Sequence, residues 1–190
     1  MESGNQQNKH ALLVIDVQDS FMYTDDWTEA DLPQYQSHQL SLIEQARIHH
    51  VPVIGILHEN PPNTGRLSFR KESGHIRLMN WLPQLDEVFK KSVHNALTDS
   101  GLLAYLQHHQ ITHLTISGIR TEQCCETTAR VASDLGFHVY YVTDATLTFP
   151  MMHRDGTAFS VREIKRHTEL VLQDRFAQIK TVAQMDEVWS

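Results

Sequence analysis

Short apolar runs alternate with longer amphipathic segments along this chain, and that alternation limits the possible folds more than any other feature. "ALLVID" (11–16) is a continuous apolar run ending in a carboxylate, which is typical of a strand buried on both faces. "VPVIGIL" (51–57) repeats the pattern after a segment, 33–50, whose apolar residues have helical spacing. Strands that alternate with helices in this way predict βα units around a parallel sheet.

The same patterns divide the rest of the chain. We expect strands at 11–16, 51–57, 86–91, 112–118, 137–145 and 177–182, and helices at 33–50, 100–110, 123–135 and 158–176. Crossovers between parallel strands are nearly always right-handed, which places helices on both faces of an open, twisted sheet. The sequence therefore predicts an α/β fold with three α-β-α layers and a six-stranded, mainly parallel sheet in the order 3-2-1-4-5-6. In such sheets, ligands bind beyond the carboxyl ends of the strands, where the strand order reverses.

Length and composition favour a single domain over residues 1–190, with a polar N-terminal tail at 1–9. The net charge of −7 disfavours a nucleic-acid or anionic-membrane surface, because both need concentrated Lys and Arg. The chain has no run of about 18 apolar residues to span a membrane, and its polar start does not resemble a secretory signal. Its two cysteines are adjacent, which is a poor basis for a disulfide, so we expect a reducing, cytoplasmic location.

Thirteen histidines raise the question of a metal site. His49 and His50 are neighbours, as are His108 and His109, so neither pair can chelate from one helix face. No Cys/His cluster has the spacing of a zinc site. We therefore expect no metal and no cofactor.

Residues 58–84 are rich in Pro, Gly and charge and have no clear period. A loop of this length in a compact domain is often a lid or a pocket wall. It is equally compatible with a plain surface excursion, and the sequence leaves both interpretations open.

Both cysteines fall where a strand turns into a helix, in "LTISGIRTEQCCETTARVASDLG". Free backbone N–H groups and the helix dipole at such a corner favour a thiolate, so we expect a lowered thiol pKa. Cys125 has the helical spacing of Ala129, Ala132 and Leu135, which we expect to pack on the sheet. Cys124 is rotated away from that stripe, so periodicity favours Cys124 as the nucleophile and Cys125 as a core residue.

Two charged residues close predicted strands. Asp16 ends the first predicted strand and would face Cys124 where the strand order reverses, which suits a general base. Lys91 ends the third strand and could stabilise developing negative charge. Taken singly, each residue has an ordinary alternative: a capping carboxylate for Asp16 and a solvated surface charge for Lys91.

Three segments occur in order along the chain: "ALLVIDVQDSF", "KSVHNAL" and "SGIRTEQCCETTARVASDLGFHVYYVTDA". Together they resemble the isochorismatase-like cysteine hydrolase superfamily, which includes nicotinamidases and N-carbamoylsarcosine amidases, over roughly residues 10–185. The resemblance implies a catalytic triad of Asp16, Lys91 and Cys124. It also implies a cis peptide between Ile119 and Arg120, with the backbone N–H groups of Arg120 and Cys124 facing an oxyanion.

The chain departs from the family pattern at some positions. Arg120 stands where the family usually has Ala, and its side chain could either bind a substrate carboxylate or project outward. His58 lacks the aspartate and second histidine of the nicotinamidase metal site, which disfavours a metal-dependent nicotinamidase.

We therefore expect a cysteine hydrolase that cleaves a small amide or carbamoyl C–N bond through a thioester. The alternative is a redox or ligand sensor that uses Cys124 without turnover. The expected partner is a small-molecule substrate, and the resemblance implies a homo-oligomer, either a dimer or a tetramer. Further pocket candidates, all in loops or at strand ends, are Gln18, Phe21, Trp27, His58 and Phe149.

Overall fold

The computed structural model describes residues 8–190, so residues 1–7 of the expected polar tail lie outside the described residues. Six strands form one sheet in the order β3-β2-β1-β4-β5-β8, and every pair of neighbours is parallel. The strands are β1 (His10–Ile15), β2 (Val53–His58), β3 (Glu87–Lys91), β4 (His113–Ile119), β5 (His138–Leu147) and β8 (Gln178–Lys180). The α/β fold class and strand order predicted from the sequence are confirmed.

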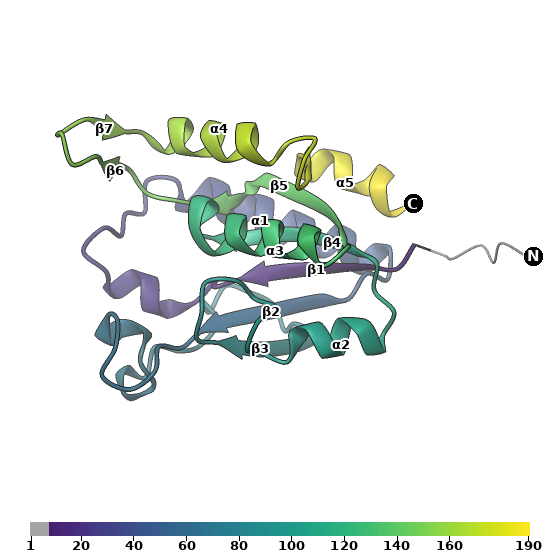
Figure 1. The fold of residues 1–190 in the computed structure, drawn as a ribbon, viewed down its shortest axis with the longest axis horizontal. Coiled ribbons are helices and arrows are strands. Elements are labelled where there is room, and N and C mark those ends of the chain that lie inside the picture. Colours follow the sequence, from purple (N-terminus) through teal and green to yellow (C-terminus); the bar gives the residue numbers. More distant parts are fainter. Residues whose placement is uncertain (1–7) are drawn as a thin grey trace, which may run out of the picture.

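Successive side chains of each strand point to opposite faces of the sheet and so contribute to two separate hydrophobic cores. Leu12 and Val14 of β1 face one core, which α1 (Leu32–Ile48) and α5 (Val182–Trp189) cover. Ala11, Leu13 and Ile15 face the other core, which α2 (Leu102–His108), α3 (Glu126–Asp134) and α4 (Val161–Leu172) cover. Figure 1 shows helices in front of and behind the sheet, which gives the three α-β-α layers.

The C-terminal third differs in detail from the sequence prediction. The last strand is short, and the segment after it forms α5, which the sequence analysis left unassigned. Met151–Met152 (β6) and Ala158–Phe159 (β7) form an antiparallel hairpin that projects beyond the sheet, at the upper left of Figure 1. Leu135 is half exposed, so its predicted packing on the sheet is wrong, whereas Ala129 and Ala132 are fully buried as predicted.

Two features bear on the expectations for the chain as a whole. Within residues 8–190, no helix is both long enough and apolar enough to cross a membrane. The loop after β2 contains two short 3-10 turns, η2 (Leu67–Phe69) and η3 (Lys71–Ser73), and folds back toward the carboxyl ends of the strands. It forms part of the wall of the cavity described below, which decides between the two interpretations of 58–84.

Candidate active site

Asp16, Lys91 and Cys124 come from the carboxyl ends of three strands, β1, β3 and β4. Asp16 follows β1 with a positive φ of 53°, and its N–H donates to the Ile56 carbonyl at 2.8 Å. Lys91 is the last residue of β3, and Cys124 lies in a π-helical turn, η4 (Thr121–Cys125), directly after β4. The sheet order places all three at the same edge, where ligands bind in open α/β sheets.

The Lys91 ammonium joins the other two side chains. Its Nζ donates to Asp16 Oδ2 at 2.8 Å and to Cys124 Sγ at 3.4 Å. The three residues are buried, with exposed fractions of 1% for Asp16, 2% for Lys91 and 7% for Cys124. Asp16 Oδ1 has no hydrogen-bond partner in the described structure, so this oxygen is available to a proton.

Burial dominates the electrostatics of the site. It raises the pKa of the Cys124 thiol, the Asp16 carboxylate raises it further, and the Lys91 ammonium opposes both. For Lys91, burial favours the neutral amine, but Asp16 and Cys124 outweigh that effect and raise the pKa of the ammonium. The expected acidic thiol is therefore wrong, because desolvation and a neighbouring carboxylate exceed the effect of the helix end. Before substrate arrives, the proton stays on sulfur.

His58 completes the polar network around Lys91. Its Nδ1 lies 3.2 Å from Lys91 Nζ, and its Nε2 lies 2.8 Å from Asn60 Oδ1. Burial and the nearby ammonium lower the pKa of His58, so the ring is neutral, with Nδ1 accepting and Nε2–H donating. Gln18 fixes the His58 backbone at both ends, because its side chain binds the N–H at 2.6 Å and the carbonyl at 3.0 Å.

The turn that carries Cys124 begins where β4 passes very close to β1. A Cβ on Gly118, which has a φ of +127°, would lie 2.0 Å from the Ile15 carbonyl oxygen, so only glycine fits there. The peptide bond between Ile119 and Arg120 is cis, and the family resemblance implied a cis peptide at this position. This part of β4 therefore sets the path of the backbone into η4.

A cavity of about 240 Å³ opens above the three side chains, and Asp16 and Cys124 both line it. Of the pocket residues predicted from the sequence, Phe21 and His58 line it, and so does Arg120. Gln18, Trp27 and Phe149 do not line it: Gln18 and Phe149 contact residues that do, and Trp27 packs against Phe149. The sequence analysis missed the remaining lining residues, which come mainly from loops: Asn60, Gly65, Arg66, Phe69, His94 and Gln123.

The Arg120 side chain is neither free in the cavity nor directed outward. Its Nη1 lies 2.5 Å from Asp26 Oδ2, and its guanidinium stacks over the Phe149 ring at 5.0 Å. Trp27 in turn packs against Phe149, with ring centroids 5.4 Å apart. Arg120 is thus held in place by an internal carboxylate and an aromatic face.

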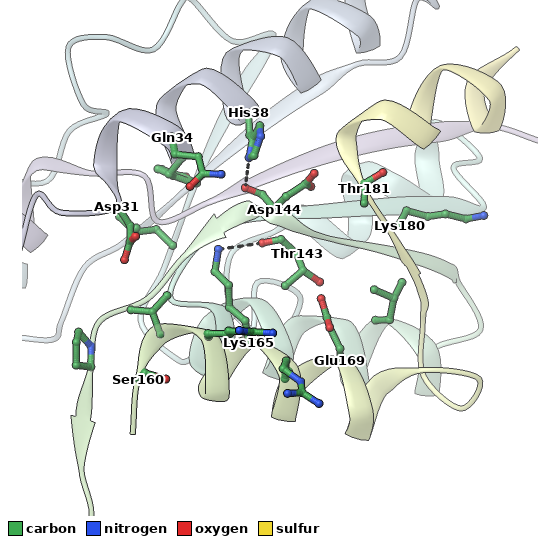
Figure 2. Close-up of a pocket in the computed structure, with 17 residues that line it drawn as sticks. Asp31, Gln34, His38, Thr143, Asp144, Ser160, Lys165, Glu169, Lys180 and Thr181 are labelled. Atoms are coloured by element: carbon green, nitrogen blue, oxygen red, sulfur yellow. Dashed lines mark hydrogen bonds between the residues drawn. The ribbon is translucent and has the colours of Figure 1, made fainter. Parts of the chain in front are cut away.

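A larger cavity lies elsewhere in the molecule. It measures about 660 Å³, is bordered by α1, β5, α4 and β8, and shares no lining residue with the cavity at Cys124. Figure 2 shows Lys165 pointing toward β5, where its Nζ donates to the Thr143 and Thr146 carbonyls, and His38 reaching Asp144. A thiol lines the cavity at Cys124, whereas no cysteine is among the described residues that line the larger cavity.

No group of three or more His, Cys, Asp or Glu side chains among residues 8–190 is arranged to hold a metal ion. The two cysteines are free thiols, and Cys125 is fully buried among the residues that pack α3 on the sheet. Cys124 is thus the cysteine that borders the cavity, which is the arrangement that periodicity predicted.

Comparison with known proteins identifies the family. Residues 10–183 match the isochorismatase domain. The uncharacterized isochorismatase family protein YrdC of Bacillus subtilis (strain 168) is 28% identical over 184 residues, covering 94% of this chain and 95% of that protein.

Solved structures share the fold. A cysteine hydrolase from Pseudomonas syringae pv. phaseolicola 1448A matches with a TM-score of 0.85 at 20% identity, over 95% of this chain and 92% of that one. N-carbamoylsarcosine amidase from Thermoplasma acidophilum matches with a TM-score of 0.72 at 19% identity, over 92% and 96%. The chain therefore belongs to the isochorismatase family, whose α/β fold it has throughout the matched residues.

Proposed function

We propose that the protein is a cysteine hydrolase that cleaves a small amide or carbamoyl C–N bond through a thioester on Cys124. The observation that carries the proposal is the position of Lys91 Nζ, 2.8 Å from Asp16 Oδ2 and 3.4 Å from Cys124 Sγ, beneath a small cavity. A nucleophile, a carboxylate base and a fixed cation within contact of one another are the parts that acyl transfer needs.

In the first step, the Asp16 carboxylate accepts the thiol proton while the sulfur attacks the substrate carbonyl carbon. A base must be adjacent, because burial keeps Cys124 protonated in the free protein. The Lys91 ammonium stabilises the charge that moves between sulfur and carboxylate. In the proposed arrangement, the backbone N–H groups of Arg120 and Cys124 bind the tetrahedral oxyanion.

In the second step, Asp16 returns the proton to the leaving nitrogen, the C–N bond breaks, and an amine or ammonia departs. The acyl group then remains on sulfur as a thioester. Asp16 is again a carboxylate, and it takes a proton from a water molecule that attacks the thioester carbonyl. Collapse of this second intermediate releases the carboxylic or carbamic acid and restores the thiol.

The names of structural relatives point the same way. One of them is called a cysteine hydrolase, and another is an N-carbamoylsarcosine amidase. The structural match to these two proteins, at 20% and 19% identity, supports the shared fold, and the arrangement around Cys124 supports the chemistry.

Mass spectrometry after exposure to a library of small amides tests the proposal. We expect an acyl adduct on the tryptic peptide "TEQCCETTAR", localised to Cys124 and released with time as the acid. A Cys125→Ala variant should still be acylated and turn over, whereas Cys124→Ala should do neither. Full hydrolysis by Cys124→Ala would contradict the mechanism. A reactive Cys124 with no turnover on any amide would favour the sensor.

A further inference from the structure

Two arginines from different segments meet at the wall of the cavity. Arg66 lies in the loop after β2, and Arg120 follows β4, and both line the cavity that holds Cys124. Asp26 binds both guanidinium groups at once: its Oδ1 lies 2.8 Å from Arg66 Nη1, and its Oδ2 lies 2.5 Å from Arg120 Nη1. One carboxylate thus occupies two groups that commonly bind the carboxylate of a ligand.

The arrangement leaves Arg120 little freedom. Its side chain is 8% exposed, and its Nη2 donates to the Phe149 carbonyl at 3.4 Å. Its Nε lies 3.2 Å from Glu122 Oε1, although neither atom makes a hydrogen bond. Glu122 is itself held by Thr148, whose hydroxyl donates to Oε2.

The charges at the cavity balance. Asp26 and Glu122 offset Arg66 and Arg120, and Asp16 offsets Lys91. Burial favours the neutral acid of Asp26, but its bonds and proximity to the two arginines outweigh that effect and lower its pKa to about 2. Asp26 is therefore ionised at any pH at which the protein would work, and no Lys or Arg among the described residues that line the cavity is left over for an anionic substrate.

We propose that Asp26 is a specificity-determining residue: by occupying Arg66 and Arg120, it makes the cavity selective for a small, uncharged amide over one that bears a carboxylate. The inference rests on the proposed function and names the substrate class for the same site. A cavity of about 240 Å³ lies below the roughly 300–1,000 Å³ of drug-sized sites, which also restricts the substrate to a small molecule.

Alkylation of Cys124 tests the inference without requiring turnover. Iodoacetamide and iodoacetate have nearly the same size and differ by one negative charge. The measured quantity is the ratio of their rate constants at Cys124, iodoacetate over iodoacetamide, by mass spectrometry at pH 8 and normalised to N-acetylcysteine. We expect a normalised ratio below one for the natural protein, because its cavity disfavours the anionic reagent. Asp26→Asn should raise the ratio on the order of tenfold, because it adds one net positive charge across a small cavity.

Asp25→Asn is the matched control. Asp25 is the exposed neighbour of Asp26, and neither arginine is bonded to it in the described structure. The inference is wrong if Asp26→Asn changes the ratio no more than Asp25→Asn does, or if the normalised ratio of the natural protein is one or higher. Arg66→Gln leaves the Asp26–Arg120 pair in place and should lower the ratio several-fold. An unchanged ratio in Arg66→Gln would overturn the inference even if Asp26→Asn failed to fold.

A substrate pair separates this inference from the proposed function. Butyramide and succinamate differ by one carboxylate, and we expect the natural protein to favour butyramide and Asp26→Asn to shift the kcat/KM ratio toward succinamate. A shifted alkylation ratio with no hydrolysis of any amide would contradict the proposed function alone. Hydrolysis with an unshifted ratio would contradict the role of Asp26 alone.

Discussion

The Lys91 ammonium lies 2.8 Å from the Asp16 carboxylate, and both side chains are almost completely buried. Removal of one partner from such a pair leaves the other charge buried and uncompensated. We expect Lys91→Met to lower the free energy of unfolding by about 3–5 kcal/mol, measured by urea denaturation at pH 7.

Lys90 provides the matched control for that variant. It precedes Lys91 on the same strand but points to the surface, where it binds Glu59 at 2.7 Å with a half-exposed side chain. Lys90→Met should cost less than about 1 kcal/mol, because exposed ion pairs contribute little. Equal losses in the two variants would show that the buried pair makes no special contribution.

Asp16 raises the pKa of the Cys124 thiol, and in the proposed mechanism it is also the base. These two roles predict opposite effects of Asp16→Asn. Alkylation of Cys124 by iodoacetamide at pH 8 should become faster, because the thiol loses a neighbouring negative charge and keeps Lys91. Hydrolysis should fall by about 10²–10⁴-fold, which is the usual effect of a general base.

The contrast is checked by measuring both rates on one preparation. Asp19→Asn serves as the control, because Asp19 is a buried carboxylate three residues later that binds Arg77 instead of Lys91. If the rates of alkylation and hydrolysis both fall in Asp16→Asn and stay unchanged in Asp19→Asn, the predicted opposite effects are absent. That result would contradict the assignment of Asp16 as the base.

The sequence predicted the sheet and the placement of the three central side chains well, because both depend on periodicity and strand order. "ALLVID" and "THLTISG" could only be central strands, and their ends bring Asp16 and Cys124 to one edge. The prediction for Leu135 failed because α3 ends at Asp134, so the stripe does not continue. The missed helix α5 did carry a local signal, a capping box between Thr181 and Gln184.

The cavity wall was less accessible to sequence reasoning. Asn60, Arg66 and Phe69 lie in a loop without periodicity, and their positions depend on contacts such as Arg66 with Asp26, 40 residues apart. The raised thiol pKa was missed for a related reason. A helix end predicts a lowered value, but burial and the Asp16 carboxylate, which are tertiary features, dominate.

Three histidine rings lie in a row across the amino ends of the strands: His10 on β1, His113 on β4 and His138 on β5. Their ring centroids lie 4.7 and 4.6 Å apart along the row. Burial and His113 lower the pKa of His10 to about 4, and burial and His138 lower the pKa of His113. Between about pH 6.5 and 4, the unfolded chain therefore binds more protons than the native protein at these positions.

The native protein therefore loses stability as the pH falls through this range. Stability from these neutral rings is complete above about pH 6.5 and is lost as the pH falls toward 4. His10→Gln should flatten this acid loss in urea denaturation measured at several pH values. His167→Gln, at an exposed position on α4, should leave the slope unchanged. A natural protein equally stable at pH 7 and pH 4.5 would contradict the prediction.

Gly118 is required by the approach of β4 to β1, and its replacement should be severe. Alanine would place a Cβ 2.0 Å from the Ile15 carbonyl oxygen at a φ of +127°, so both the clash and the backbone conformation are unfavourable. Strain of about 1–3 kcal/mol and overpacking of a similar size together predict a loss of about 2–6 kcal/mol in Gly118→Ala. Gly156→Ala has a positive φ of 89° but nothing within 4 Å, so only the strain remains. Thermal denaturation of the two variants compares these costs. Gly118 pairs with Ile15, next to Asp16, and precedes the turn that carries Cys124, so displacement of β4 should also abolish alkylation selectivity for Cys124 over Cys125.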